Sequence, residues 1–230
     1  MCTQGYTPEM ATNSQPAPAR INVVDLQTGN IGSVIKMLNR IGADPKVVQS
    51  AKELEPRVPV IFPGVGHYTQ ASSALDASGL REPLDDAFRS GRPFLGICLG
   101  AQLMGTGSEE GAGQGLGWLP TRVRRFPPQD TSGRPLRVPH MAWQPFAPAP
   151  GALPFDVPPG RMYFAHSYYI DPTPLGSEVA CASEFGGVRF VSVARVGNAV
   201  GAQFHPEKSH IFGMSFLRGW IGWATTEMGR

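Results

Sequence analysis

Short apolar runs alternate with amphipathic stretches along the first half of the chain. Apolar runs of strand length occupy residues 21–26 (INVVDL), 45–50 (PKVVQS), 58–64 (VPVIFPG) and 92–98 (RPFLGIC). Helical spacing of apolar positions occupies residues 30–43, ending near Gly42, and residues 67–90 in two pieces, with another helix expected after Leu99. This alternation predicts an α/β fold with an open, mostly parallel central sheet and helices on both faces.

The pattern changes after residue 118, where short β-type segments are separated by Pro and Gly. These segments are residues 122–126, 162–169, 178–183, 189–196 and 198–205. They predict antiparallel strands added to the sheet in the C-terminal half. Residues 209–228 (SHIFGMSFLRGWIGWATTEM) predict a closing amphipathic helix, and the Pro-rich residues 145–159 predict a surface loop.

Residues 1–20 have no apolar period of 2 or 3.6 and are rich in Pro, Ala and polar residues, which predicts a disordered leader. The remaining residues 21–230 are expected to form a single domain, since 230 residues with 41% hydrophobic content suffice for one compact core.

Charge and composition exclude several classes of partner. A net charge of +2 with 17% charged residues gives no reason to expect nucleic acid as a partner, since nucleic-acid binding needs a strongly basic face. No apolar stretch approaches the roughly 18 residues that span a membrane. Three cysteines cannot form a closed disulfide framework, and no signal peptide is apparent, so we expect a cytoplasmic protein.

Residues 96–100 (GICLG) place Cys98 between two glycines at the end of a predicted strand. The form G-x-nucleophile-x-G is that of a nucleophile elbow, in which the glycines permit a tight strand-to-helix turn. The positive end of the following helix favours a thiolate, and the N–H of Leu99 is then available to an oxyanion. The same residues also fit a small buried cysteine whose glycines serve packing alone.

A nucleophilic cysteine needs a base, and His205 follows an apolar strand with Glu207 two residues on. Positions i and i+2 of an extended segment point to the same side, so imidazole and carboxylate can form a hydrogen bond. Cys98, His205 and Glu207 are therefore the predicted triad. The alternatives are a surface histidine beside a solvated carboxylate, or a base at His166 or His67.

The loop IFPGVGHY, residues 61–68, turns sharply after a buried strand and can supply a second oxyanion donor at Val65. The chain order nucleophile, histidine, acid also differs from that of the α/β-hydrolases, which place the acid before the histidine.

Taken together, GICLGAQLMG, PGVG and QFHPEKS resemble the motifs of class I glutamine amidotransferases. The segments SEEGAGQGLGWLP (108–120), VPHMAW (138–143) and YFAHSYY (163–169) resemble more narrowly the glutaminase subunit of imidazole glycerol phosphate synthase. The resemblance runs from about residue 21 to the C-terminus, and the motifs in this order are specific as a set.

The resemblance implies that glutamine is hydrolysed to glutamate and ammonia, and that the ammonia passes to a separate (β/α)₈-barrel cyclase. That cyclase makes imidazole glycerol phosphate and an aminoimidazole carboxamide ribonucleotide (AICAR) in histidine biosynthesis. No cofactor or metal is implied. Partners are therefore glutamine and the cyclase subunit of a heterodimer.

The resemblance also implies roles for individual residues. Cys98 forms the γ-glutamyl thioester, His205 transfers the proton, Glu207 orients His205, and Val65 and Leu99 form the oxyanion hole. The residues implied to bind glutamine are Gly66, Gln102, Glu110, His166, Ser167 and Tyr168, and those implied to contact the cyclase are Trp143, Tyr163 and Lys208.

The sequence departs from the family at Ala142 and Gln144, where Gly and Asn are usual beside the Trp of the PHMGWN motif. In the family this motif faces the cyclase. The two departures therefore concern how well this chain would fit the cyclase. Other functions remain open: an amidotransferase that supplies another synthase, such as one aminating a surface-polysaccharide sugar; a γ-glutamyl hydrolase; or a non-catalytic regulatory subunit.

Overall fold

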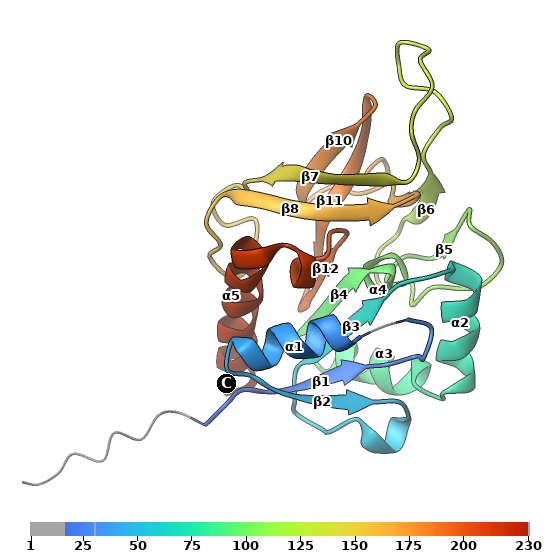
Figure 1. Ribbon diagram of the computed structural model, residues 1–230. Helices are drawn as coiled ribbons and strands as arrows, with labels where there is room; N and C mark the ends of the chain where they lie inside the picture. The colour runs from blue at the N-terminus through green and yellow to red at the C-terminus, as the bar shows by residue number, and fades with distance from the viewer. Residues whose placement is uncertain (1–16, 30, 230) are drawn as a thin grey trace, which may run out of the picture.

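A computed structural model describes residues 17–29 and 31–229 of the chain (Figure 1). Most of the expected leader, residues 1–16, lies outside the described residues, whereas residues 17–19 have no regular structure and β1 begins at Arg20.

The central sheet has seven strands in the order β10-β11-β12-β4-β3-β1-β2. Its parallel part comprises β1 (Arg20–Val24), β2 (Asp44–Val48), β3 (Val60–Gly64), β4 (Phe94–Cys98) and β12 (Ala199–Ala202). β10 (Val179–Phe185) and β11 (Val188–Val196) continue the sheet as antiparallel strands. The expected mostly parallel sheet with added antiparallel strands is confirmed.

Helices cover both faces because neighbouring strand residues point to opposite sides. Val23 and Ile61 belong to one apolar core with α1 (Gly32–Arg40) and α5 (His210–Met228). Phe62, next to Ile61, belongs to the second core with α2 (Tyr68–Ala77) and α3 (Arg81–Arg89). In α5 the buried residues Gly213, Phe216, Leu217, Trp220 and Ala224 follow helical spacing, as the amphipathic pattern predicted.

The remaining strands form two small sheets, which differs from the expectation that every late hairpin joins the central sheet. One contains β5 (Gly107–Ser108), β6 (Arg122–Arg125) and β9 (Tyr168–Ile170). The other pairs β7 (His140–Phe146) with β8 (Gly160–His166), and it lies across the upper part of the molecule in Figure 1. The sequence pattern did not predict β7, because Pro139 precedes the strand and Pro145 lies within it.

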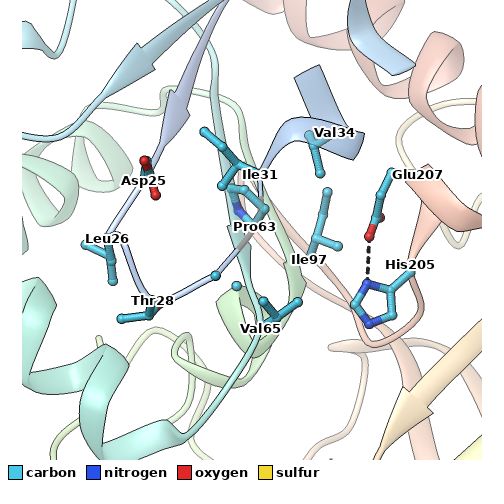
Figure 2. A pocket seen from close by; sticks show the side chains of 12 residues that line it. Asp25, Leu26, Thr28, Ile31, Val34, Pro63, Val65, Ile97, His205 and Glu207 are labelled. Carbon is cyan, nitrogen blue, oxygen red and sulfur yellow. Dashed lines mark hydrogen bonds and ion pairs between the residues drawn. The ribbon is translucent and has the colours of Figure 1, made fainter. Parts of the chain in front are cut away.

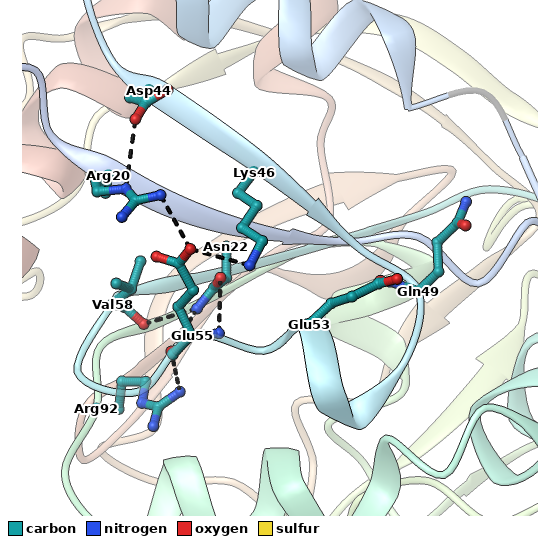
Figure 3. Close-up of polar contacts among 9 residues, drawn as sticks. All are labelled: Arg20, Asn22, Asp44, Lys46, Gln49, Glu53, Glu55, Val58 and Arg92. Atoms are coloured by element: carbon teal, nitrogen blue, oxygen red, sulfur yellow. Dashed lines mark hydrogen bonds and ion pairs between the residues drawn. The ribbon is translucent and has the colours of Figure 1, made fainter.

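Three shorter elements complete the chain: the 3₁₀ turns η1 (Ala51–Glu53) and η2 (Pro206–Lys208), and the one-turn helix α4 (Leu99–Gln102). Near the β2 edge of the sheet, the buried Asn22 of β1 donates to the carbonyls of Glu55 and Val58, and the Glu55 carboxylate bridges Arg20 and Lys46 (Figure 3). These contacts satisfy the polar groups where β1, β2 and the loop before β3 meet.

The contact between α4 and β3 depends on Gly100, since a Cβ atom there would lie 1.8 Å from the carbonyl oxygen of Phe62. We expect Gly100→Ala to lower the free energy of unfolding by about 3 kcal/mol or more, because a backbone atom in a strand cannot move aside. Urea unfolding measures this. The control is Gly222→Ala in α5, where a Cβ meets nothing within 4 Å and about 0.5–1 kcal/mol of stabilisation is expected. Equal midpoints for the two variants would contradict the prediction.

Candidate active site

A pocket of about 210 Å³ opens at the carboxyl ends of β3 and β4, the edge at which α/β sheets bind ligands. The sequence-predicted residues that line it are Val65, Gly66, Cys98, Leu99, Gln102, Glu110, His166, Ser167, Tyr168 and His205. Pro139 and Ala165 line it as well and were not expected from the sequence. The pocket therefore gathers residues that are spread over most of the chain.

Cys98 occupies a strained turn between β4 and α4. Its backbone has φ 51° and ψ −107°, a positive φ that residues with a side chain seldom adopt. Gly96 makes the turn possible, because a Cβ there would lie 2.8 Å from Ala101 backbone atoms. Cys98 is 7% exposed and lines the pocket. α4 has only four residues, so its dipole supplies less than a long helix would, and the neighbouring side chains carry more of the electrostatics.

His205 lies beyond β12 and lines the same pocket as Cys98. Its Nδ1 donates to Glu207 Oε1 at 2.8 Å (Figure 2). The other ring nitrogen, Nε2, is therefore the one available to Cys98. Burial lowers the pKa of His205, but the charge and hydrogen bond of Cys98, together with the hydrogen bond and charge of Glu207, outweigh burial and raise it above the usual value. A protonated His205 beside Cys98 is suited to acyl transfer through a thiolate.

Glu207 is also buried, with 5% of its side chain exposed. Its Oε2 has no hydrogen-bond partner among the described residues. A second, smaller cavity lies on this side of the pair and is lined by Ile31, Val34 and Val65 among others (Figure 2). Val65, in the expected oxyanion loop, and His205 line both cavities.

The ring nitrogens of His166 are both engaged by the protein. Nδ1 lies 2.8 Å from the Tyr168 carbonyl, which can only accept, so Nδ1 carries the proton. Nε2 lies 3.3 Å from Nδ1 of His140, which must then donate, and Gln144 Nε2 donates to His140 Nε2 at 3.2 Å. The amide of Gln144, one of the departures from the family pattern, thus begins a directed chain that ends at Tyr168.

Burial keeps both of these histidines neutral. Desolvation lowers the pKa of His166 to about 3 and that of His140 to about 4. A neutral imidazole whose two nitrogens are occupied cannot serve as the base, and the exposed His67 accepts from the N–H of Thr69 at the start of α2 instead. The alternative bases at His166 and His67 therefore have no geometric support.

Two polar side chains define the far side of the pocket. Glu110 accepts from the N–H of Tyr68 through Oε2 at 2.8 Å, in a turn rather than at a helix end. Gln102 donates from Nε2 to the Tyr168 carbonyl at 2.8 Å. A carboxylate and neutral amide and backbone groups suit the ammonium and carboxylate of an amino acid, respectively.

The residues expected to contact a partner lie outside the pocket. Trp143 and Tyr163 face each other across β7 and β8 with ring centroids 5.8 Å apart, and Trp143 also stacks on His210. Lys208 is exposed in η2 and borders a groove with Ile211. Met141 and Ile211, which are 63% and 68% exposed, were not expected from the sequence. For Met141, the sequence offered one indication: apolar residues alternate at positions 141 and 143, as they do along one face of a strand.

Comparison with known proteins identifies the family. The family model for class I glutamine amidotransferases matches residues 22–218. The chain belongs to the class I glutamine amidotransferase family. The family that the sequence motifs indicated is thereby confirmed.

Curated members of this amidotransferase family extend along nearly the same length. Imidazole glycerol phosphate synthase subunit HisH of Nostoc punctiforme is 41% identical over 206 residues, covering 87% of this chain and 94% of its own. The HisH subunit of Geobacillus kaustophilus is 41% identical over 207 residues, covering 89% and 97%.

Solved structures support the amidotransferase fold. A crystal structure of a glutamine amidotransferase has a TM-score of 0.69 at 20% identity, covering 89% of this chain and 98% of that one. The structure of PurLQS from Thermotoga maritima has a TM-score of 0.61 at 18% identity, covering 92% and 97%. At these identities the likeness concerns the fold.

Neither a metal cluster nor a membrane span is found in the described part of the chain. Within residues 17–29 and 31–229, no three His, Cys, Asp or Glu side chains are arranged to hold a metal ion. No helix among those residues is long and apolar enough to cross a membrane.

The neutral histidines of this amidotransferase predict sensitivity to acid. A histidine whose pKa is lowered in the folded state binds fewer protons than in the unfolded chain, so stability is full above about pH 6.5 and falls as the pH drops toward 4. His140→Asn removes one such group while its Nδ2 can replace the Nδ1 donor to His166. We expect the variant to lose about 1–2 kcal/mol less than wild type between pH 8 and pH 5.

Urea unfolding at the two pH values measures the difference. The control is His67→Asn, because His67 is exposed and asparagine can still cap α2. A stability loss in His140→Asn equal to that of wild type would show that His140 is not the group responsible.

Proposed function

We propose that the chain is the glutaminase subunit of an imidazole glycerol phosphate synthase. It hydrolyses glutamine to glutamate and ammonia and delivers the ammonia to a (β/α)₈-barrel cyclase, which makes imidazole glycerol phosphate and AICAR in histidine biosynthesis. The observation that carries the proposal is the pocket in which Cys98 and its neighbour His205 meet the glutamine-binding residues expected from the motifs. The HisH relatives, which match along almost their whole length, support the choice of acceptor.

In the proposed reaction, Cys98 Sγ attacks the side-chain carbonyl carbon of glutamine. The oxyanion accepts hydrogen bonds from the N–H groups of Leu99 and Val65, and Leu99, as the first residue of α4, has no helical partner for its N–H. His205 Nε2 donates its proton to the leaving nitrogen, so that ammonia departs and the thioester forms. His205 then accepts a proton from water, whose oxygen attacks the thioester and releases glutamate.

Glu207 supports both steps without taking the proton itself. Its carboxylate holds Nδ1–H of His205, which fixes Nε2 as the nitrogen that faces the sulfur. Glu110, Gln102, His166 and the segment Ser167–Tyr168 would hold the amino-acid end of glutamine. Gly66, with φ +104°, lets the loop turn over the substrate.

The partner surface in this proposal is the exposed face around Trp143, Tyr163 and Lys208. Aromatic side chains on a rigid hairpin are suited to an interface, and Lys208 can pair with an acidic residue of the cyclase. Because Lys208 directly follows Glu207, a partner that binds it acts one residue from the triad. The proposed function agrees with the cytoplasmic location that we expect from the sequence.

Cys98→Ala separates glutamine chemistry from acceptor chemistry. We expect at least a 10³-fold loss of glutamine-dependent synthesis in the reconstituted complex, because the nucleophile is absent. Synthesis supplied with ammonium salt should be unchanged, since the barrel's own chemistry does not use the thiol. Both rates are measured with purified cyclase. An equal loss of ammonia-dependent turnover would make Cys98 structural, and wild type that uses no glutamine with this cyclase would overturn the proposed acceptor.

Coupling to the partner is tested at Lys208. The isolated chain should have little glutaminase activity, and cyclase with bound nucleotide should raise it strongly. Lys208→Ala should lower this stimulation about tenfold, or 1.4 kcal/mol, while the KM for glutamine changes little. Lys52→Ala, in the exposed turn η1 far from β7 and β8 in the fold, is the matched control and should match wild type. An unchanged stimulation ratio in Lys208→Ala would remove the residue from the coupling.

A further inference from the structure

Gln203 is a buried polar residue for which neither the motifs nor the triad provide a role. It is fully buried and lies just beyond β12, whose residues pair in parallel with β4. Its backbone N–H donates to the Ser192 carbonyl of β11 at 3.0 Å, which anchors it in the sheet. Gln203 precedes His205 by two positions in an extended segment, so both side chains can reach the same side.

The side-chain amide of Gln203 contacts the sulfur directly. Nε2 lies 3.8 Å from Cys98 Sγ, within hydrogen-bond distance for sulfur, and Oε1 accepts from Gln102 Nε2 at 3.2 Å. Because a glutamine amide is buried here at both ends, its two groups must each find a partner, and the contacts with Cys98 and Gln102 provide them.

The orientation of this amide follows from its neighbours. The Tyr168 carbonyl can only accept, so the group of Gln102 beside it is the NH₂. The second N–H of that NH₂ points to Gln203, which must therefore present its oxygen to Gln102 and its own NH₂ to Cys98. The donor to the sulfur is thus determined by a backbone carbonyl of the glutamine pocket.

We propose that Gln203 is a further catalytic residue, which donates a hydrogen bond to Cys98 Sγ and stabilises the thiolate. This inference rests on the proposed nucleophilic role of Cys98. The thiolate then has two donors: protonated His205, which gives up its proton during the reaction, and the Gln203 amide, which does not. When His205 has released its proton, the amide remains as the donor that keeps the sulfur oriented toward the pocket.

The hydrogen bond between Gln102 and Gln203 also connects Cys98 to the amino-acid end of the pocket. Gln102 lines the pocket and shares one NH₂ between the Tyr168 carbonyl and Gln203. Groups at the amino-acid end of the pocket and the sulfur at its base therefore belong to one hydrogen-bonded unit. A shift of the Tyr168 carbonyl on substrate binding would reach Cys98 through two side-chain amides.

The test is the alkylation rate of Cys98 by iodoacetamide, because this small neutral reagent reacts with the thiolate and needs neither glutamine nor a partner. Gln203→Met has similar volume but no donor, and Gln203→Glu keeps an oxygen for Gln102 while a carboxylate replaces the donor. Ser192→Ala is the matched control: Ser192 is fully buried in the adjoining strand, and its Oγ has no partner among the described residues.

At pH 7 we expect Ser192→Ala to match wild type, Gln203→Met to react about tenfold more slowly, and Gln203→Glu to react more slowly still. The pH profile of the reaction should move to higher pH in both Gln203 variants. The other titratable groups around the sulfur are His205 with Glu207 behind it, and His166 and Glu110 across the pocket. They are the same in all variants, and Gln203→Glu alone adds a carboxylate to them.

Mass spectrometry of the Cys98 peptide gives the rate, with the Cys181 peptide of the same sample as an internal reference. Thermal unfolding shows which variants are folded at the assay temperature, and Gln203→Glu keeps the test available if Gln203→Met is unfolded. Wild-type rates and pH profiles in a folded Gln203 variant would overturn the inference. The expected order of rates in a chain that fails to hydrolyse glutamine even with nucleotide-bound cyclase would retain the inference while overturning the proposed function.

Discussion

The backbone of Cys98 is the constraint on which the rest of the site depends. A positive φ at a residue with a side chain is strained, and it persists only where surrounding contacts hold it. Those contacts come from the approach of α4 to β3, where Gly100 lies against the Phe62 carbonyl and Gly64 against Leu99. The turn directs the sulfur into the pocket and ends β4 where β12 ends beside it. His205 and Gln203 reach Cys98 because β12 pairs with β4 at this point.

Three buried histidines show how neighbours decide the chemistry of one side chain. His140 and His166 lie among aromatic rings; His140 donates to His166 and His166 donates to the Tyr168 carbonyl. Burial lowers the pKa values of both histidines. His205 is equally buried, yet Cys98 and Glu207 on its two sides raise its pKa. Neutral rings suit a rigid wall of the pocket, whereas a charged ring suits proton transfer.

Local sequence patterns predicted the elements whose formation depends on residues close together in the chain. The strands and helices from β1 to α4 follow apolar periodicity, and GICLG indicates its turn because glycines at those positions have a steric reason. The division of the late hairpins among three sheets was not predictable, since it depends on pairings between distant segments. The same holds for the contact of Gln203 with Cys98, which are 105 residues apart, and for the bond between His140 and His166. Roles assigned to single residues stay predictions.

The place of β12 in the sheet has a consequence for the newly made chain on the ribosome. This strand is the last of the central sheet to be synthesised, yet it lies between β4 and β11, in contact with the strand that ends at Cys98. Until it emerges, Cys98 has neither His205 nor Gln203 beside it and is an ordinary cysteine. The proposed reactivity of Cys98 therefore depends on residues 199–230, the last seventh or so of the polypeptide, which complete the sheet beside β4. An incomplete chain released early would carry the elbow but not the chemistry.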